Sequence, residues 1–182
     1  MLTIPNALTG LRALGIPLFL WAGLDGSHDF LALIILAVGG ATDYFDGKLA
    51  RALNQTSRFG ELADPAIDRI YIFATLYLLY SRGAVSLWLV ALLVCRDLIL
   101  AVQLLVMKRN GVPPHSVTYI GKAATFNLLY AFPFLLLTLH KGWLGTLSYV
   151  LGWSFAFWGT ALYLFTGVTY FMDGSRAIKG ER

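Results

Sequence analysis

Charged residues are scarce in this chain. Lys, Arg, Asp and Glu make up 13% of its 182 residues, whereas 58% are hydrophobic. A soluble domain has roughly 25% charged and 45–50% apolar residues, so the composition excludes an ordinary soluble protein and predicts an integral membrane protein. The length allows one compact transmembrane domain, residues 1–182, without a sizeable module outside the membrane.

Cysteine is nearly absent as well. The single Cys95 excludes an intramolecular disulfide and gives no information about the redox compartment. The first residues lack the basic segment that opens a cleavable signal peptide, so we expect the N-terminal segment to be retained. The chain has no internal repeat and no low-complexity tract.

Long apolar runs are what the sequence does contain. Six of them are long enough, or nearly so, for the roughly 20-residue helix that spans a bilayer. They cover about residues 7–25, 29–50, 63–81, 85–107, 117–139 and 144–171. We therefore expect an all-α integral membrane protein with six transmembrane helices. The stretch TIPNALTGLR, with Pro5 near its start, could form a short interfacial helix before the first span.

Basic residues are distributed unevenly between the two sides of six such spans. One side collects ten Lys and Arg residues, and the other has only Arg82 and Lys141. By the positive-inside rule, both termini then face the cytoplasm, which suits a multi-pass protein of the cell membrane. The basic residues are dispersed among apolar spans, so nucleic acid is not an expected partner.

Four aspartates stand at the cytoplasmic ends of the second and third runs, in ATDYFDGKLARALNQTSRFGELADPAIDRIY. Asp43 and Asp46 are three residues apart at the end of the second run. Asp64 and Asp68 are four apart at the start of the third, so each pair shares one helix face. Asp64 before Pro65 also suits an N-cap with proline at the first helical position. An N-cap role would account for Asp64 and would leave the other three aspartates unexplained.

Carboxylates that converge in a low-dielectric setting repel one another unless a cation holds them. Arg51, Arg58 and Arg69 could contribute, but clustered oxygen ligands suit Mg2+, Mn2+ or Ca2+ better. The pattern therefore predicts a divalent metal site. Mg2+ commonly shares its coordination with substrate phosphates and waters, which points to a phosphorylated substrate.

Small residues surround the aspartates. They could serve close helix packing or leave room for a nucleotide against the helix. Both interpretations stay open for Gly39 and Gly40, and the position of Gly47 beside Asp46 favours the nucleotide.

The spacing of this stretch resembles the signature of the CDP-alcohol phosphatidyltransferase family at every fixed position. Written out, it is Asp43-x2-Asp46-Gly47-x2-Ala50-Arg51-x8-Gly60-x3-Asp64-x3-Asp68. The family consists of six-helix membrane enzymes, commonly homodimers, that transfer a phosphatidyl group from a CDP-linked lipid to an alcohol and release CMP. The resemblance therefore implies the CDP-alcohol phosphatidyltransferase fold.

The resemblance also implies roles for the fixed residues. Two divalent ions, Mg2+ or Mn2+, would be bound around the pyrophosphate by Asp43, Asp46, Asp64 and Asp68. Asp68 would in addition be the general base for the acceptor hydroxyl. The nucleotide pocket would be shaped by Gly47, Ala50, Arg51 and Gly60.

The opening IPNALTGLR looks like the N-terminus shared by phosphatidylglycerophosphate synthases and the cardiolipin synthases that use CDP-diacylglycerol. By that similarity Asn6, Thr9 and Arg12 would lie near the nucleotide or the phosphates. The alternative interpretation makes Asn6 and Thr9 helix caps. It makes Arg12 a cytoplasmic anchor whose side chain snorkels to the membrane surface.

The fourth run bears on the acceptor. Phosphatidylglycerophosphate synthases tend to carry an Arg-Glu pair with a second arginine eight residues after the first. Here the pair is Arg96-Asp97, and the residue eight positions after Arg96 is Leu104, which weakens glycerol 3-phosphate as the acceptor. CRDLILAVQLLVMKRNG looks more like cardiolipin synthases, and GKAATFNLLYAFPFLLL, with GWSFAFWGTALY downstream, resembles cardiolipin synthases of actinobacteria.

This second resemblance implies that the chain transfers a phosphatidyl group from CDP-diacylglycerol to phosphatidylglycerol, giving cardiolipin and CMP. Arg96 and Lys122 are candidates for binding phosphate groups of the donor or the acceptor, and each could instead be a topology charge. Phosphatidylglycerophosphate synthase is the alternative within the family.

Two other classes of protein are alternatives. An ion-coupled transporter would distribute its aspartates across the depth of the membrane, but here they gather toward one surface. A structural scaffold would tolerate Asp68→Asn.

Overall fold

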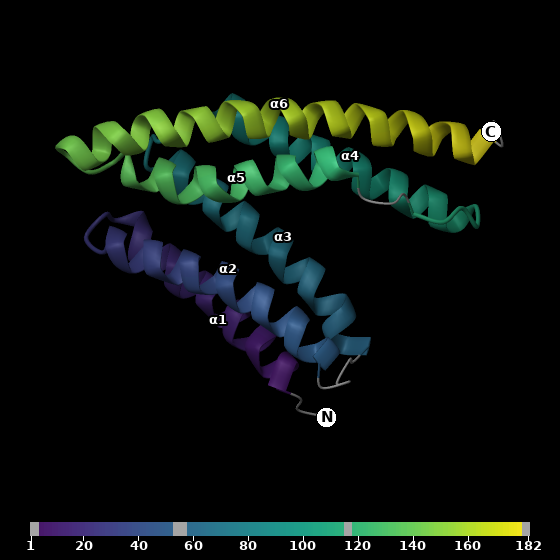
Figure 1. Cartoon of the computed structure of the whole chain (residues 1–182), viewed down its shortest axis with the longest axis horizontal. Helices are drawn as coiled ribbons and strands as arrows, with labels where there is room; N and C mark the ends of the chain where they lie inside the picture. The colour runs from purple at the N-terminus through teal and green to yellow at the C-terminus, as the bar shows by residue number, and fades with distance from the viewer. Residues whose placement is uncertain (1–3, 53–57, 115–117, 180–182) are drawn as a thin grey trace. The chain divides into compact units, whose positions relative to one another are not determined.

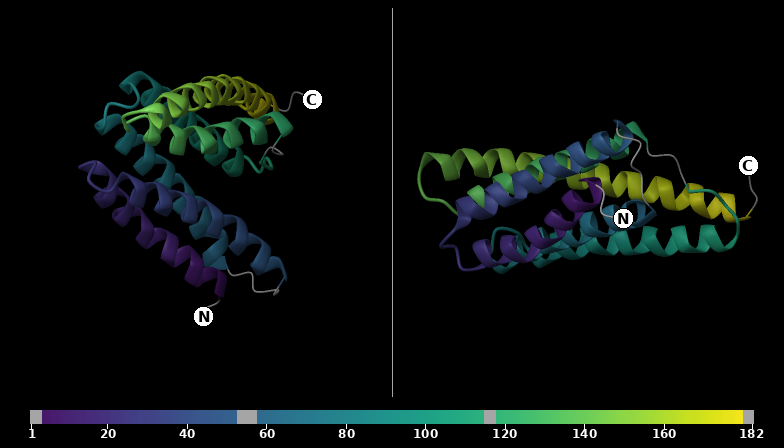
Figure 2. Two further views of the ribbon diagram at one scale, coloured as in Figure 1. Left: turned by 60° about the vertical axis from the view of Figure 1, so that its left-hand side comes forward. Right: turned by 90° about the horizontal axis from the view of Figure 1, so that it is seen from below.

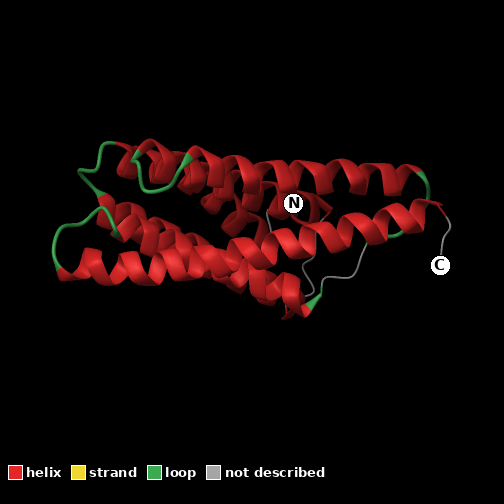
Figure 3. Cartoon of the chain, turned by 90° about the horizontal axis from the view of Figure 1, so that it is seen from above, coloured by secondary structure: helices red, strands yellow, loops and turns green. Residues whose placement is uncertain are grey.

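The computed structural model describes the backbone of residues 4–52, 58–114 and 118–179, and side chains in these ranges except at 4–7, 43–52 and 58–65. Six helices make up most of this part of the chain (Figure 1): α1 (Ile4–Leu24), α2 (Asp29–Ala52), α3 (Arg58–Ser81), α4 (Leu87–Arg109), α5 (Tyr119–Leu137) and α6 (Trp143–Lys179). Between them, where the backbone is described, lie only loops and turns (Figure 3). The expected all-α fold with six helices is confirmed.

Membrane-spanning capacity is not equal among the helices. Among the described residues, three helices are long and apolar enough to cross a bilayer by themselves: Leu87–Arg109, Tyr119–Leu137 and Trp143–Lys179. Shorter apolar segments occur at Leu8–Leu24 and Asp29–Thr42. The chain is therefore a membrane protein, and a count of six spans stays a prediction.

Three helix ends differ from the expectation. The segment around Pro5 is the first turn of α1 rather than a separate interfacial helix. The helix α3 begins at Arg58, so Asp64 lies inside it and is not its N-cap. Pro65 is the eighth residue of α3, beyond the first turn in which proline costs no helical hydrogen bond. The helix α6 continues to Lys179 rather than ending near residue 171.

The chain divides into two compact units, residues 1–84 and 85–182. In the first unit, α1 packs against both α2 and α3. Its buried face has helical spacing and includes Thr9, Arg12, Ile16, Phe19 and Ala22. The face is apolar toward the C-terminus of α1 and polar toward the N-terminus, which places the polar part beside the aspartate-bearing helices.

The other end of the first unit is closed by an ion pair. Arg82 follows α3 and donates to both carboxylate oxygens of Asp29 at 2.7 and 3.1 Å, and to the backbone carbonyl of Gly23. The bond to Asp29 raises the pKa of Arg82 above its usual value. The end of α1, the start of α2 and the end of α3 therefore meet at one place.

In the second unit, α6 packs against both α4 and α5. The helix α5 runs antiparallel to it, with Gly121 beside Tyr170 and Leu128 beside Gly159. The helix α4 runs parallel to α6, because Gln103 donates to the carbonyl of Phe171 while Arg96, two turns earlier, contacts Tyr163. Figure 2 gives two further views of these helices.

Candidate active site

The motif aspartates lie on two helices of the first unit. Asp43 and Asp46 are in the last part of α2, and Asp64 and Asp68 are in the first half of α3. Because α2 runs antiparallel to α1 and α3, the aspartate-bearing ends of α2 and α3 lie at the same end of the unit as the start of α1 (Figures 1 and 2). The side chains of Asn6, Asp43, Asp46, Gly47, Ala50, Arg51, Gly60 and Asp64 lie outside the described residues.

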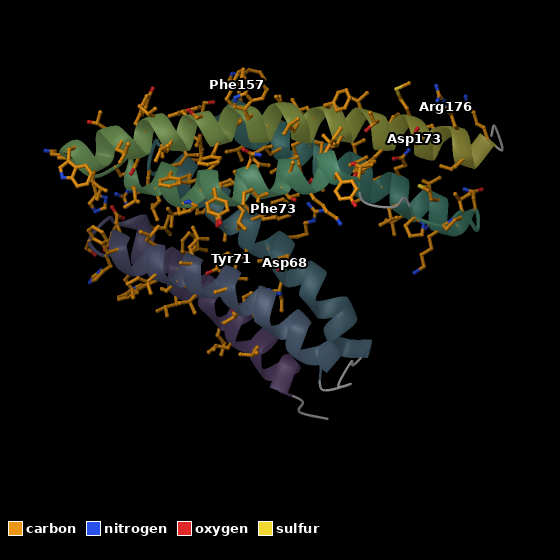
Figure 4. All side chains as sticks on the ribbon, viewed as in Figure 1. Asp68, Tyr71, Phe73, Phe157, Asp173 and Arg176 are labelled. Atoms are coloured by element: carbon orange, nitrogen blue, oxygen red, sulfur yellow. The ribbon has the colours of Figure 1, made fainter. Side chains whose placement is uncertain are left out.

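Asp68 is the motif aspartate whose side chain is described, and Arg12 of α1 holds it. An Nη2 atom of Arg12 lies 3.1 Å from Oδ1 of Asp68. The side chain of Arg12 is 2% exposed, whereas that of Asp68 is 46% exposed. Figure 4 shows Asp68 on α3, one turn before Tyr71. The pair therefore presents a carboxylate to the surroundings and keeps its cation beneath.

This geometry corrects the anchor interpretation of Arg12. A snorkelling side chain would extend to the membrane surface, but Arg12 is buried and directed at α3. The cap interpretation of Thr9 is also wrong, because α1 starts at Ile4 and Thr9 is buried inside it. Thr9 and Arg12 are three residues apart on the same buried face of α1.

The glycines of α2 differ from each other. A Cβ on Gly39 would lie 3.0 Å from the hydroxyl of Tyr71, which itself donates to the carbonyl of Ile35 at 3.1 Å. Gly39 therefore serves close packing of α2 against α3. Gly40 is exposed and a Cβ there would meet nothing within 4 Å, so packing does not explain it.

The chemistry of the donors fits a divalent metal. The described side chains contain no group of three metal-ligating residues, but three of the four motif aspartates lie outside them. Four carboxylates on α2 and α3 are the hard oxygen ligands that Mg2+ and Mn2+ take, and the side chain of Asp68 is 46% exposed.

A second polar centre lies in the other unit, around Arg96 of α4. Arg96 Nη1 lies 3.1 Å from Oδ1 of Asp97, and Arg96 Nε donates to the carbonyl of Tyr163 at 3.3 Å. The guanidinium carbon is 3.7 Å from the centre of the Tyr163 ring. The Tyr163 hydroxyl donates to Asp97 at 2.5 Å. Arg96 is thus embedded in the bundle, unlike a charge that only marks topology.

Lys122 of α5 lies near the same level of the second unit. It follows Gly121, which is beside Tyr170 of α6, whereas Arg96 contacts α6 at Tyr163 and Gly167. Lys122 is exposed, and its ammonium lies 5.5 Å from the centre of the Tyr119 ring. The two cations proposed from the sequence therefore lie on α4 and α5, which both pack against α6, near the stretch from Tyr163 to Tyr170.

The sequence interpretation missed Tyr163 and Gly167. The signal available was a tyrosine, a threonine and a glycine at spacing i, i+3 and i+4 in the apolar α6, at Tyr163, Thr166 and Gly167. This spacing places two polar residues and one small residue on one face of the helix. It does not indicate that an arginine 67 residues away in the sequence will contact that face.

Comparison with known proteins identifies the class. The sequence model of the CDP-alcohol phosphatidyltransferase family matches residues 2–158, and the chain belongs to this family. It is therefore a transferase of phospholipid biosynthesis, as the aspartate spacing predicted. Enzymes of the family generally depend on a divalent metal.

Individual relatives are similar over the whole chain. The CMP-forming cardiolipin synthase of Streptomyces coelicolor is 47% identical over 100% of this chain and 86% of its own length. A Mycobacterium tuberculosis protein provisionally named cardiolipin synthase is 36% identical over 98% of the chain and 86% of its own length. A CDP-diacylglycerol–glycerol-3-phosphate 3-phosphatidyltransferase of Cereibacter sphaeroides is 35% identical over 48% of the chain and 41% of its own length.

Proposed function

We propose that this enzyme transfers the phosphatidyl group of CDP-diacylglycerol to a hydroxyl of phosphatidylglycerol, giving cardiolipin and CMP. One observation carries the choice of acceptor. Similarity to a CMP-forming cardiolipin synthase extends over the whole chain at 47% identity, whereas similarity to a Mycobacterium tuberculosis protein named probable phosphatidylglycerophosphate synthase extends over 68% of it at 35% identity.

The reaction needs a base near the acceptor hydroxyl, and Asp68 is the proposed base. Its carboxylate is exposed enough to reach a substrate, and the guanidinium of Arg12 holds it from the buried side. A carboxylate positioned in this way takes the proton from the attacking hydroxyl as the oxygen forms its bond to phosphorus. Arg12 also keeps a positive charge close to the site where phosphates would bind.

The donor would be bound at the same end of the first unit. Two Mg2+ or Mn2+ ions, held by Asp43, Asp46, Asp64 and Asp68, would neutralise the pyrophosphate and stabilise charge on the departing CMP oxygen. The nucleotide pocket would be formed by Gly47, Ala50, Arg51, Gly60, Asn6 and Thr9. The burial of Thr9 next to Arg12 supports its place in this set.

The acceptor phosphate would be bound by Arg96 and Lys122. Both are cations of the second unit at a similar level of α6, and an arginine inside a membrane bundle commonly marks a substrate path. We further propose that residues 1–182 act as one domain of a homodimer in the cell membrane, with the active site toward the cytoplasm. The basic residues at the ends of α4 and α6 support that orientation.

Purified enzyme with CDP-diacylglycerol and Mg2+ tests the proposal directly. We expect CMP release and cardiolipin formation with phosphatidylglycerol, and at least tenfold slower release with glycerol 3-phosphate. Release of CMP with glycerol 3-phosphate but none with phosphatidylglycerol would overturn the choice of acceptor. That result would favour the alternative function, phosphatidylglycerophosphate synthase, which the partial similarity to the Cereibacter sphaeroides enzyme supports.

A further inference from the structure

The guanidinium of Arg96 is fixed by three different contacts. Asp97 pairs with Nη1, the carbonyl of Tyr163 accepts from Nε, and the Tyr163 ring lies against the face of the guanidinium. The Tyr163 hydroxyl also bonds to Oδ1 of Asp97, the same oxygen that pairs with Arg96. Tyr163 therefore contacts Arg96 directly and also orients its carboxylate partner.

The surface of α6 is shaped to receive the stem of Arg96. A Cβ on Gly167 would lie 3.0 Å from both Cγ and Nε of Arg96, so a larger residue would push the side chain away. Thr166 donates its hydroxyl to the Tyr163 carbonyl at 3.1 Å, and that carbonyl also accepts from Arg96. One turn of α6 thus forms a cradle, which consists of Tyr163, Thr166 and Gly167.

These contacts leave the Nη2 group of Arg96 over. Among the described residues, Nη2 has no hydrogen-bond partner, and it is not one of the fully buried polar atoms. The side chain as a whole is 12% exposed. A charged group in a membrane bundle is costly and is expected to be fully paired or functional. Arg96 is therefore held through Nε and Nη1, and its Nη2 group is left to donate to an anion.

We propose that Tyr163, assisted by Gly167, is a positioning residue that presents Arg96 to a phosphate oxygen of the lipid acceptor. The inference rests on the proposed function, because it assigns the acceptor phosphate to Arg96. A guanidinium already fixed by its neighbours loses little conformational entropy when the phosphate binds, so preorganisation strengthens binding. The Tyr163 ring also stabilises the cation where water is scarce.

Two substitutions separate the contributions of Tyr163. Tyr163→Phe keeps the ring against Arg96 and removes the bond to Asp97, and Tyr163→Leu removes both. We expect the KM for phosphatidylglycerol to rise about threefold in the first variant and tenfold or more in the second. The KM for CDP-diacylglycerol should stay within twofold in both. Tyr149→Phe and Tyr149→Leu are matched controls on an exposed part of α6 and should change neither constant.

A binding measurement decides the inference without turnover. Delipidated protein is incubated with phosphatidylglycerol or with phosphatidylcholine of the same chain length, and retained lipid is counted by native mass spectrometry. Wild type and the Tyr149 variants should retain phosphatidylglycerol preferentially, and Tyr163→Leu and Gly167→Leu should lose the preference. If Tyr163→Leu does not fold, Tyr163→Phe should show a partial loss.

The outcomes distinguish the inference from the proposed function. Unchanged lipid preference in the Tyr163 variants, or equal changes in both KM values, would overturn the positioning role. Absence of cardiolipin formation by wild type would refute the proposed function, and the lipid-retention experiment would still decide whether Tyr163 and Arg96 form an anion site.

Discussion

Among the described side chains, three arginines of low exposure lie next to aspartates. Arg12 pairs with Asp68, Arg82 with Asp29, and Arg96 with Asp97. Removing one member of a buried pair leaves an uncompensated charge, so these pairs constrain the helices that they join. They differ in what they leave exposed: in the first pair the carboxylate is half exposed, and in the other two it is buried.

The half-exposed carboxylate of Asp68 gives the first prediction. Asp68→Asn keeps the size and the polarity of the side chain but removes its ability to accept a proton. We expect CMP release to fall by about 10²–10⁴-fold, with an unchanged size-exclusion profile. Asp173→Asn, at an exposed position of α6, is the control and should keep wild-type activity. Activity of Asp68→Asn within a factor of three of wild type would contradict the proposed base.

The carboxylate set gives the second prediction. Because clustered aspartates would hold divalent ions, dialysis against EDTA should abolish CMP release, and Mg2+ or Mn2+ should restore it. Ca2+ prefers longer bonds and more ligands than Mg2+. We therefore expect Ca2+ to restore less CMP release than Mg2+ does. Full activity after chelation would argue against a metal-dependent reaction.

At the scale of single residues, the sequence was informative where spacing alone defines chemistry. The four aspartates could be assigned to one motif from their separation along the chain. The burial of Arg12 and the cradle of Tyr163 could not, because each depends on contacts between helices that are distant in sequence. A periodic pattern shows which face of a helix is apolar, but not which partner that face meets.

Among the elements, α5 and α6 depend on glycine for their close approach. A Cβ on Gly152 would lie 3.0 Å from the backbone nitrogen of Leu135, and one on Gly159 would lie 3.1 Å from the Cβ of Asn127. Backbone atoms cannot move aside as a flexible side chain can. Small residues let transmembrane helices approach in this way.

This packing gives the third prediction. Gly152→Ala should destabilise the protein by about 1–3 kcal/mol and lower the Tm of the detergent-solubilised enzyme by several degrees. Gly10→Ala is the matched substitution, because a Cβ there meets nothing within 4 Å and alanine favours the helix more than glycine does. Its Tm should not fall. Equal Tm values for the two variants would show that the α5–α6 contact is not tight.

The apolar runs predicted the six helices well but not all of their ends. Hydropathy marks the part of a helix that suits lipid, whereas a helix can continue beyond the membrane with polar residues. The helix α3 starts at Arg58 and α6 extends to Lys179 for this reason. Where a cap defines the start, as with Ser86 before α4 and Thr118 before α5, the limit is sharper.

For the whole molecule, the direction of the helices agrees with the distribution of charge. Within each unit, consecutive helices run antiparallel, so the basic ends of α4 and α6 lie on one side. The ion pair of Arg82 and Asp29 then belongs to the opposite side from the aspartate motif in the first unit.

The fourth prediction tests this topology. In a Cys95→Ala background, Ser27→Cys should react with a membrane-impermeant maleimide in intact cells. Asn110→Cys should react only after the membrane is opened. Ser27 follows α1 and Asn110 follows α4. If all six helices span the membrane, three spans separate the two positions and place them on opposite sides. Labelling of both positions in intact cells, or of neither, would contradict six spans.

The distance along the chain between Arg96 and its cradle also has a consequence for biosynthesis. Arg96 and the Tyr163 carbonyl are separated by 67 residues. At about 5–20 residues per second, translation takes roughly 3–13 s to cover that distance. The helix α4, with Arg96 and Asp97, is therefore synthesised several seconds before the turn of α6 that will contact Arg96. Asp97, the immediate neighbour of Arg96, is the partner that belongs to the same helix, so α4 contains a counter-charge for its arginine before α6 has been made.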